Sequence, residues 1–237
     1  MTLAYDIVGR GRTVLFVHGA LSSRRVFGYQ LLGLSSTHRV VAADLPGHGA
    51  SAWPATSASW LDVACDGLVE LLRRIAAPRP VIVGWSAGAA VAQVVASQCE
   101  GATLVLVGAS TAVAPDDAAN AALDRPLSAD FPRYARSVVR MFTHAPVSRE
   151  TEDWLFSMAM LTTPAATREA LATARREGAA PLDPEAVTIH GAHDLLVVED
   201  RRLNSPGRHR VFDGSGHAPF LEEKPAFNRA IAEIAAG

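Results

Sequence analysis

Short and almost continuous apolar runs recur along the chain, and each ends in a glycine or a polar residue. They are TVLFVHG (13–19), RVVAADLPG (39–47), PVIVGWS (80–86), ATLVLVGAS (102–110) and AVTIHGAHD (186–194). Their length and their content of β-branched residues predict β-strands. Because the runs do not alternate between apolar and polar positions, we expect strands buried on both faces, as in a parallel sheet.

Longer segments with apolar residues at helical spacing separate these runs, most clearly over 60–77 and 86–99. Such segments predict amphipathic or buried helices between the strands. A repeated order of strand and helix predicts an α/β fold with a doubly wound, mostly parallel sheet.

The alternation stops between about 112 and 183, where prolines are frequent. Helical patterns occur there over 131–142 and 163–178, without a convincing strand. We therefore expect a helical cap inserted after a late core strand. The expected division is a first part of the core at 1–111, a helical cap at 112–183 and a second part of the core at 184–237, closing with a helix over 224–236.

A serine stands at the junction of one predicted strand and the next helix. In GWSAG, Gly84 and Gly88 flank Ser86 at the G-x-S-x-G spacing. Glycines allow the strand and the helix to approach closely, while the serine occupies a strained turn that exposes its Oγ. Two other interpretations are a serine that caps the helix and a nucleotide-binding turn, although no G-x-G-x-x-G is present here.

A nucleophilic serine needs a base, and the base needs an acid that orients it. Asp194 follows the predicted strand 186–194, and His217 lies in a glycine-rich loop before the last helix. Both residues are expected at the carboxyl ends of parallel strands, where open sheets bind ligands. The order Ser86, Asp194, His217 therefore predicts a catalytic triad, with Asp116 or Asp117 as the alternative acid.

Two backbone N–H groups are the expected oxyanion hole. One belongs to Ala87, directly after the serine at the start of a helix. The other belongs to Ala20, in the loop HGA after the first long parallel strand. His18 is expected to brace that loop rather than to take part in the chemistry.

Composition excludes several other classes of protein. The chain has 237 residues, 49% of them hydrophobic, and a formal net charge of −2. This charge gives no general attraction for nucleic acid or an anionic membrane. The first residues predict no signal peptide. No apolar run reaches roughly 18 residues, so no membrane segment is expected. The isolated Cys65 and Cys99 fit a reducing cytoplasm, and no metal-site or cofactor fingerprint is found.

Taken together, the motifs resemble those of the α/β-hydrolase superfamily. The segments that carry the resemblance are HGA (18–20), DLPGHGAS (44–51), GWSAG (84–88), GAHD (191–194) and GSGHAPFLEEKP (214–225). The resemblance covers both ends of the chain and implies a cap domain in between. It also implies a structural role for Asp44 and His48. A serine at 86 argues against the dehalogenase and epoxide hydrolase branches, which carry an aspartate there.

Within the superfamily, the chain is most similar to the pimeloyl-acyl-carrier-protein methyl ester esterases of biotin synthesis. The similar segments are GWSAG, HAPF (217–220) and ADFPRYARSVVRMF (129–142). The resemblance implies that arginines of a cap helix contact an acidic acyl carrier protein. Arg133, Arg136 and Arg140 would share one helix face, and a solvated cap surface is the alternative. Ala20 stands where those enzymes carry a tryptophan.

The sequence thus predicts a cofactor-free serine hydrolase that acts on a small-molecule carboxylic ester. Trp85 and Phe142 are the expected lining of its acyl pocket. Lactone hydrolysis, hydrolysis of a carbon–carbon bond and perhydrolysis use the same triad and remain alternatives. A ligand-binding receptor built on a hydrolase fold is the alternative outside enzymes.

Overall fold

The computed structural model describes residues 2–53, 58–110, 126–177, 183–197, 202 and 208–237. Within them, seven strands form one sheet in the order β1-β3-β2-β4-β5-β6-β7. The strands are β1 (Tyr5–Val8), β2 (Thr13–Val17), β3 (Arg39–Ala43), β4 (Val81–Trp85), β5 (Thr103–Val107), β6 (Val187–Gly191) and β7 (His209–Phe212). All neighbouring pairs are parallel except β1 with β3.

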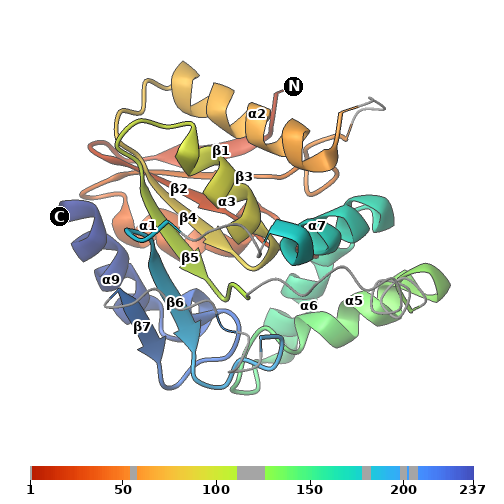
Figure 1. Ribbon diagram of the computed structural model, residues 1–237. Helices are drawn as coiled ribbons and strands as arrows, with labels where there is room; N and C mark the ends of the chain where they lie inside the picture. Colours follow the sequence, from red (N-terminus) through yellow and green to blue (C-terminus); the bar gives the residue numbers. More distant parts are fainter. Residues whose placement is uncertain (1, 54–57, 111–125, 178–182, 198–201, 203–207) are drawn as a thin grey trace.

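Helices cover both faces of the sheet (Figure 1). They include η1 (Arg24–Phe27), α1 (Gly28–Leu34), α2 (Trp60–Arg74), α3 (Ala87–Ser97), α5 (Phe131–Val139), α6 (Arg149–Ala159), α7 (Pro164–Glu177), α8 (Pro219–Glu222) and α9 (Lys224–Ala236). Helices α2 and α3 lie on one face, and α1 and α9 lie on the other. No described helix has both the length and the apolar character needed to cross a membrane.

The hydrophobic core is split by the sheet into two layers, because successive side chains of a strand point to opposite faces. On β2, Phe16 packs with Phe27 and the cluster on the α1 and α9 side. Leu15 packs in the other cluster, with Trp60 and the α2 and α3 side. The central strands are therefore buried throughout, which explains their continuous apolar sequences.

The α/β architecture with a mostly parallel sheet expected from the sequence is confirmed. The sequence analysis did not identify β1, which pairs antiparallel with β3 at the edge. Its residues are half-buried or exposed, so they form no continuous apolar run. It also did not identify the short α1 or α6. A capping signal marks α6, since Ser148 accepts a hydrogen bond from the amide of Thr151.

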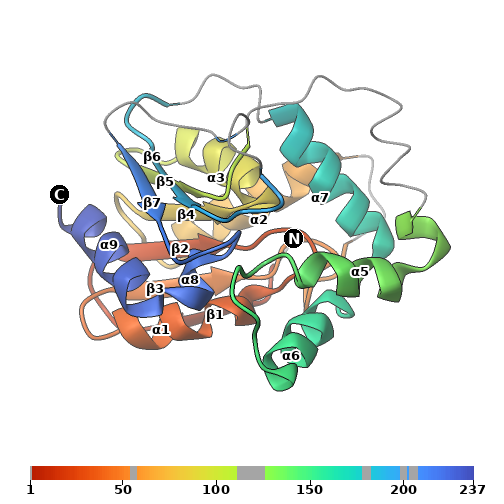
Figure 2. The same ribbon diagram turned by 90° about the horizontal axis from the view of Figure 1, so that it is seen from below.

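Between β5 and β6 the described chain is helical. Helices α5 and α6 pack on each other beyond one end of the sheet, and α7 packs against α2 and α3 (Figure 2). Residues 111–125 and 178–182 lie outside the described residues. The separate cap domain at 112–183 stays a prediction.

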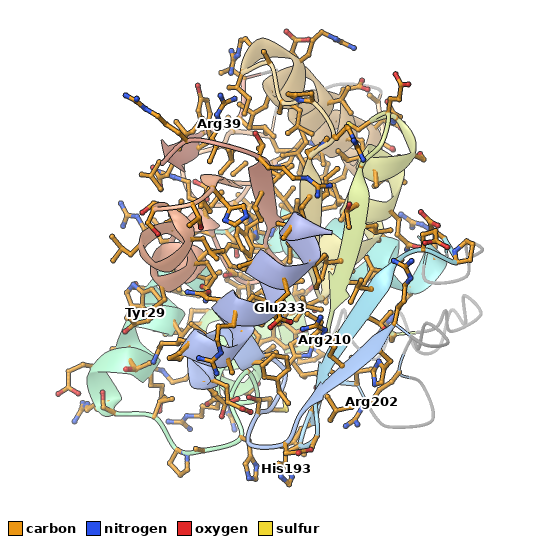
Figure 3. All side chains as sticks on the ribbon, turned by 90° about the vertical axis from the view of Figure 1, so that its left-hand side faces the viewer. Tyr29, Arg39, His193, Arg202, Arg210 and Glu233 are labelled. Carbon is orange, nitrogen blue, oxygen red and sulfur yellow. The ribbon has the colours of Figure 1, made fainter. Side chains whose placement is uncertain are left out.

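The strands end on the same side as the helices of this region. Figure 3 shows Arg39, the first residue of β3, and His193, which follows β6, at opposite ends of the sheet. The same view shows Arg210 of β7 beside Glu233 of α9, whose Nη1 and Oε2 atoms are 2.8 Å apart. The carboxyl ends of the strands form the side on which the candidate site lies.

Candidate active site

Ser86 occupies the sharp turn between β4 and α3. Its backbone has φ 54° and ψ −123°, a conformation that residues other than glycine rarely adopt and that costs about 1–3 kcal/mol. The amide N–H of Ser86 donates to the carbonyl oxygen of Val107 at 2.8 Å, which ties the turn to β5. The serine is partly exposed and lines a cavity of about 500 Å³.

The two glycines of G-x-S-x-G are required by close contacts. A Cβ atom on Gly84 would lie 2.5 Å from the carbonyl oxygen of Gly88 and from Cβ of Ala92. A Cβ atom on Gly88 would lie 2.4 Å from the carbonyl oxygen of His18. Both distances are too short for a side chain. The absence of side chains therefore allows α3 to start directly against β4 and β2.

Asp194 and His217 are brought together across the ends of β6 and β7. The Nδ1–H of His217 donates to Oδ2 of Asp194 at 2.8 Å, and both side chains are buried. Oδ1 of Asp194 accepts from the amides of Leu196 at 2.8 Å and Val197 at 3.0 Å. Burial alone would raise the pKa of Asp194, but the histidine and these hydrogen bonds outweigh burial and lower it. The acid is therefore a carboxylate at neutral pH.

The second ring nitrogen of His217 is not used by the contact with Asp194. Nε2 is buried and has no hydrogen-bond partner among the described residues, and His217 lines the same cavity as Ser86. No hydrogen bond joins Ser86 Oγ to this nitrogen. Because Nδ1 donates to Asp194, the neutral ring carries its lone pair on Nε2. That nitrogen is therefore able to accept a proton.

The loop after β2 lies directly against the serine. A Cβ atom on Gly19 would be 2.9 Å from Cβ of Ser86. His18 braces this loop, because Nε2 accepts from the amide of Leu45 at 3.0 Å and Nδ1 donates to Gly19 O at 2.8 Å. Burial lowers the pKa of His18, so the ring is neutral. Ala20 in this loop lines the cavity.

The two amides expected to form an oxyanion hole belong to Ala87, which follows Ser86 in sequence, and to Ala20, in the loop that lies against Ser86. Ala87 is the first residue of α3, so its N–H has no partner within the helix. Among the described residues, no backbone or side-chain acceptor takes the N–H of Ala20. Both amides are therefore available to a ligand.

The buried Asp44 and His48 form hydrogen bonds with other groups of the chain and do not line the cavity. Asp44 accepts from Arg24, and His48 Nδ1 donates to the carbonyl oxygen of Pro46.

One face of α5 forms much of the cavity wall. Tyr134, Ser137 and Val138 of α5 and Met141, two residues after its end, recur at the i, i+3, i+4, i+7 spacing, and all four line the cavity. This spacing is visible in the sequence, but the sequence analysis did not use it to predict residues of the cavity wall. The other described residues of the wall are Ala20, Leu21, Ser86, Ala89, Ala90, Gln93, Gly108, Ala109, Ser110, Pro126, Phe142, Leu171, Ala174, Arg175, Leu196, Val197 and His217.

Trp85 does not line the cavity, contrary to the expectation, whereas Phe142 does. Trp85 is only 1% exposed and packs edge-on against Phe142 and Phe220. Its Nε1–H donates to the carbonyl oxygen of His217 at 2.9 Å. Neighbouring residues at a strand end point in opposite directions, so the tryptophan lies beneath the site while Ser86 faces it.

Arg133 and Arg136 of α5, and Arg140 directly after it, do not line the cavity. Nη1 of Arg136 lies 3.0 Å from Oε1 of Glu152 and 3.2 Å from Oδ1 of Asp153. Nη2 of Arg140 lies 2.9 Å from Oε1 of Glu152. Arg133 is exposed. Two of the three expected carrier contacts therefore bind α6 of the same chain. The alternative acids Asp116 and Asp117 lie outside the described residues.

The sequence matches the alpha/beta hydrolase family over residues 14–230, and the chain belongs to this family. A curated relative is the "AB hydrolase superfamily protein YisY" of Bacillus subtilis, 24% identical over 99% of this chain and 95% of that protein. Another is the "Pimeloyl-[acyl-carrier protein] methyl ester esterase" of Vibrio cholerae, 28% identical over 99% of this chain and 98% of that protein.

Solved structures agree on the fold. The esterase EaEST of Exiguobacterium antarcticum superposes with a TM-score of 0.86 at 19% identity, covering 99% of this chain and 96% of that one. At this identity, the likeness bears on the fold alone. Function within the family depends on the residues of the site.

Proposed function

We propose that this chain is a serine-dependent carboxylic ester hydrolase with Ser86, His217 and Asp194 as its catalytic triad. The observation that carries the proposal is the hydrogen bonding of the two ring nitrogens of His217. Its Nδ1 is held by Asp194, its Nε2 has no hydrogen-bond partner among the described residues, and His217 lines the same cavity as Ser86. This is the arrangement that a general base requires.

The reaction follows from these positions. His217 Nε2 accepts the proton of Ser86 as Oγ attacks the ester carbonyl carbon. The amides of Ala20 and Ala87 stabilise the negative charge that develops on the carbonyl oxygen. His217 then returns the proton to the leaving alcohol. A water molecule, activated by the same nitrogen, releases the acid from Ser86. Asp194 stabilises the imidazolium and keeps Nδ1 protonated.

Family membership and the names of the curated relatives support ester hydrolysis on a small-molecule substrate. The cavity volume of about 500 Å³ suits such a ligand. Lactone hydrolysis, carbon–carbon bond hydrolysis and perhydrolysis would use the same residues, and a substrate panel separates them.

A fluorophosphonate probe together with p-nitrophenyl esters tests the proposal. The wild type should label rapidly and hydrolyse the esters, whereas Ser86→Ala should do neither, with a rate loss of at least about 1,000-fold. Ser97→Ala is the matched control, because Ser97 is exposed at the other end of α3 and its Oγ bonds Val94 O. No labelling of the wild type would contradict the assignment and favour a binding protein, whereas labelling that persists in Ser86→Ala would contradict it by showing that another residue is the nucleophile.

The curated esterase relatives favour a finer candidate substrate, a methyl ester carried on an acyl carrier protein. Arg140→Glu is unsuitable for testing this candidate, because it would also break the ion pair with Glu152. Arg133→Glu, on an exposed site, should raise KM for a carrier-linked methyl ester and leave a small methyl ester unchanged. Equal KM values for the carrier-linked ester in both proteins would remove the docking role of this arginine.

A further inference from the structure

The loop that carries His217 lies directly on the connection between α5 and α6, residues 140–148. A Cβ atom on Gly216 would be 2.7 Å from an amide nitrogen of this connection, which leaves no space for a side chain. The amide of Ala218 donates to the carbonyl oxygen of Phe142 at 2.8 Å. The residues on both sides of the histidine therefore contact the α5–α6 connection.

One carboxylate joins these two segments. Glu222, the last residue of α8, is half-buried, and its Oε2 accepts from the amide of Gly216 at 2.7 Å. Its Oε1 accepts from the amides of His144 at 2.7 Å and Ala145 at 3.0 Å. Hydrogen bonds to an ionised acceptor are about twice as strong as those between neutral groups. One oxygen thus holds the residue before His217, and the other holds the α5–α6 connection.

The same connection also contacts the surroundings of the other two groups in the proton path. The ring centroids of Phe142 and His217 are 6.2 Å apart. The ring of His144 stacks on that of His193, with centroids 3.7 Å apart. His193 directly precedes Asp194 and lies beyond the end of β6, as Figure 3 shows. Holding the histidine loop to this connection therefore fixes its place relative to the end of β6.

We propose that Glu222 is a positioning residue that holds His217 where it can accept the proton of Ser86. The inference rests on the proposed ester hydrolysis and adds to it a residue outside the triad. Glu222 is not among the described residues that line the cavity, so it acts through the backbone of Gly216 and the α5–α6 connection. Both of its oxygens must accept, which only a carboxylate side chain can provide.

Glu222→Gln tests this role with almost no change of shape. Glutamine has one oxygen acceptor and one NH2 group, so one of the two segments meets an N–H in place of an acceptor whichever way the amide turns. We expect kcat on p-nitrophenyl acetate to fall about 10- to 100-fold, because a misplacement of about 1 Å costs on the order of 100-fold. KM should change less than about 3-fold, since Glu222 does not line the cavity.

Glu223→Gln is the matched control. Oε1 of Glu223 accepts from both the amide of Gly214 at 3.0 Å and Oγ of Ser215 at 2.8 Å, and glutamine keeps one oxygen for them. This variant should retain the wild-type kcat. Titration with a fluorophosphonate counts the active sites, so kcat is compared per active enzyme. A wild-type kcat in Glu222→Gln would overturn the proposal.

Two further variants keep the test decisive. Glu222→Asp retains both oxygens on a side chain one methylene shorter and should recover part of kcat, and it replaces Glu222→Gln if thermal melting shows that the glutamine variant does not fold. Asp194→Asn leaves His217 in the wrong tautomer, so the position of the ring then matters less. Glu222→Gln should lower kcat less than about 3-fold further in that background. The same 10- to 100-fold loss in both backgrounds would show that Glu222 does not act through His217.

Proton NMR separates failure of this inference from failure of the proposed function. The Nδ1–H of His217, which Asp194 holds at 2.8 Å, should give a far-downfield resonance. Glu222→Gln should shift or broaden this resonance, and Glu223→Gln should leave it in place. If the wild type hydrolyses no ester but this difference holds, ester hydrolysis is wrong and the positioning role stands. An identical resonance in Glu222→Gln would refute the positioning role.

Discussion

Replacing Gly88 by alanine should disable the enzyme without touching a catalytic group. The new Cβ atom would lie 2.4 Å from the carbonyl oxygen of His18 and 2.5 Å from that of Val17. Real Cβ atoms essentially never approach closer than 3.0 Å. The start of α3 must therefore move away from β2 by about 0.6 Å or more. Backbone atoms form the obstacle, so no side-chain rotation can relieve it.

The movement acts on the groups proposed to carry the reaction. Ser86 and the amide of Ala87 lie at the start of α3, so both move relative to the loop that contains Ala20. A misplacement of about 1 Å costs on the order of 100-fold in rate. Overpacking of this kind also costs about 1–3 kcal/mol of stability. We therefore expect Gly88→Ala to lower kcat about 100-fold and to lower the melting temperature by several degrees.

The assay combines initial rates on p-nitrophenyl butyrate with thermal melting of the same preparation. Gly28→Ala is the matched control, because nothing lies within 4 Å of a Cβ atom at Gly28 and its φ of −53° suits alanine. This change should leave kcat unchanged and should leave the melting temperature unchanged or raise it. Wild-type kcat and melting temperature in Gly88→Ala would refute the reasoning, since the contact would then tolerate a side chain.

Three further predictions concern the residues around the site. Asp194→Asn should lower kcat by about 100- to 10,000-fold with little effect on the melting temperature, because His217 loses its orienting carboxylate; a loss under 10-fold would point to another acid. Trp85→Phe should cost about 1–3 kcal/mol in urea unfolding, because the carbonyl oxygen of His217 loses a buried donor; an unchanged midpoint and slope would contradict this. Burial lowers the pKa of His48 to about 3. Below pH ~6.5 the unfolded chain therefore binds a proton that the folded chain does not, and the free energy of unfolding decreases as the pH is lowered. His48→Asn should remove about 2 kcal/mol of the loss between pH 6 and 4.5 in urea unfolding, and an unchanged pH dependence would show that His48 titrates normally.

The positions proposed as a triad could be predicted from the sequence because the topology supplies most of their proximity. Parallel strands place their carboxyl ends at one edge of the sheet, so residues that follow β4, β6 and β7 converge there. Ser86, Asp194 and His217 therefore needed only strand boundaries and chain order to be chosen. The glycines beside Ser86 also have a local cause, the close approach of a strand and the next helix.

The direction of side chains and their partners on distant elements required the tertiary structure. Trp85 adjoins the serine in sequence, yet it points beneath the site. Arg136 follows the periodicity of an exposed helix face, yet it binds acids that the chain supplies from α6. Arg175 is one of two adjacent arginines on α7, and only the packing of that helix on α3 turns it toward the cavity. Local periodicity predicts which residues of one helix share a face, but the packing of neighbouring elements determines what that face contacts.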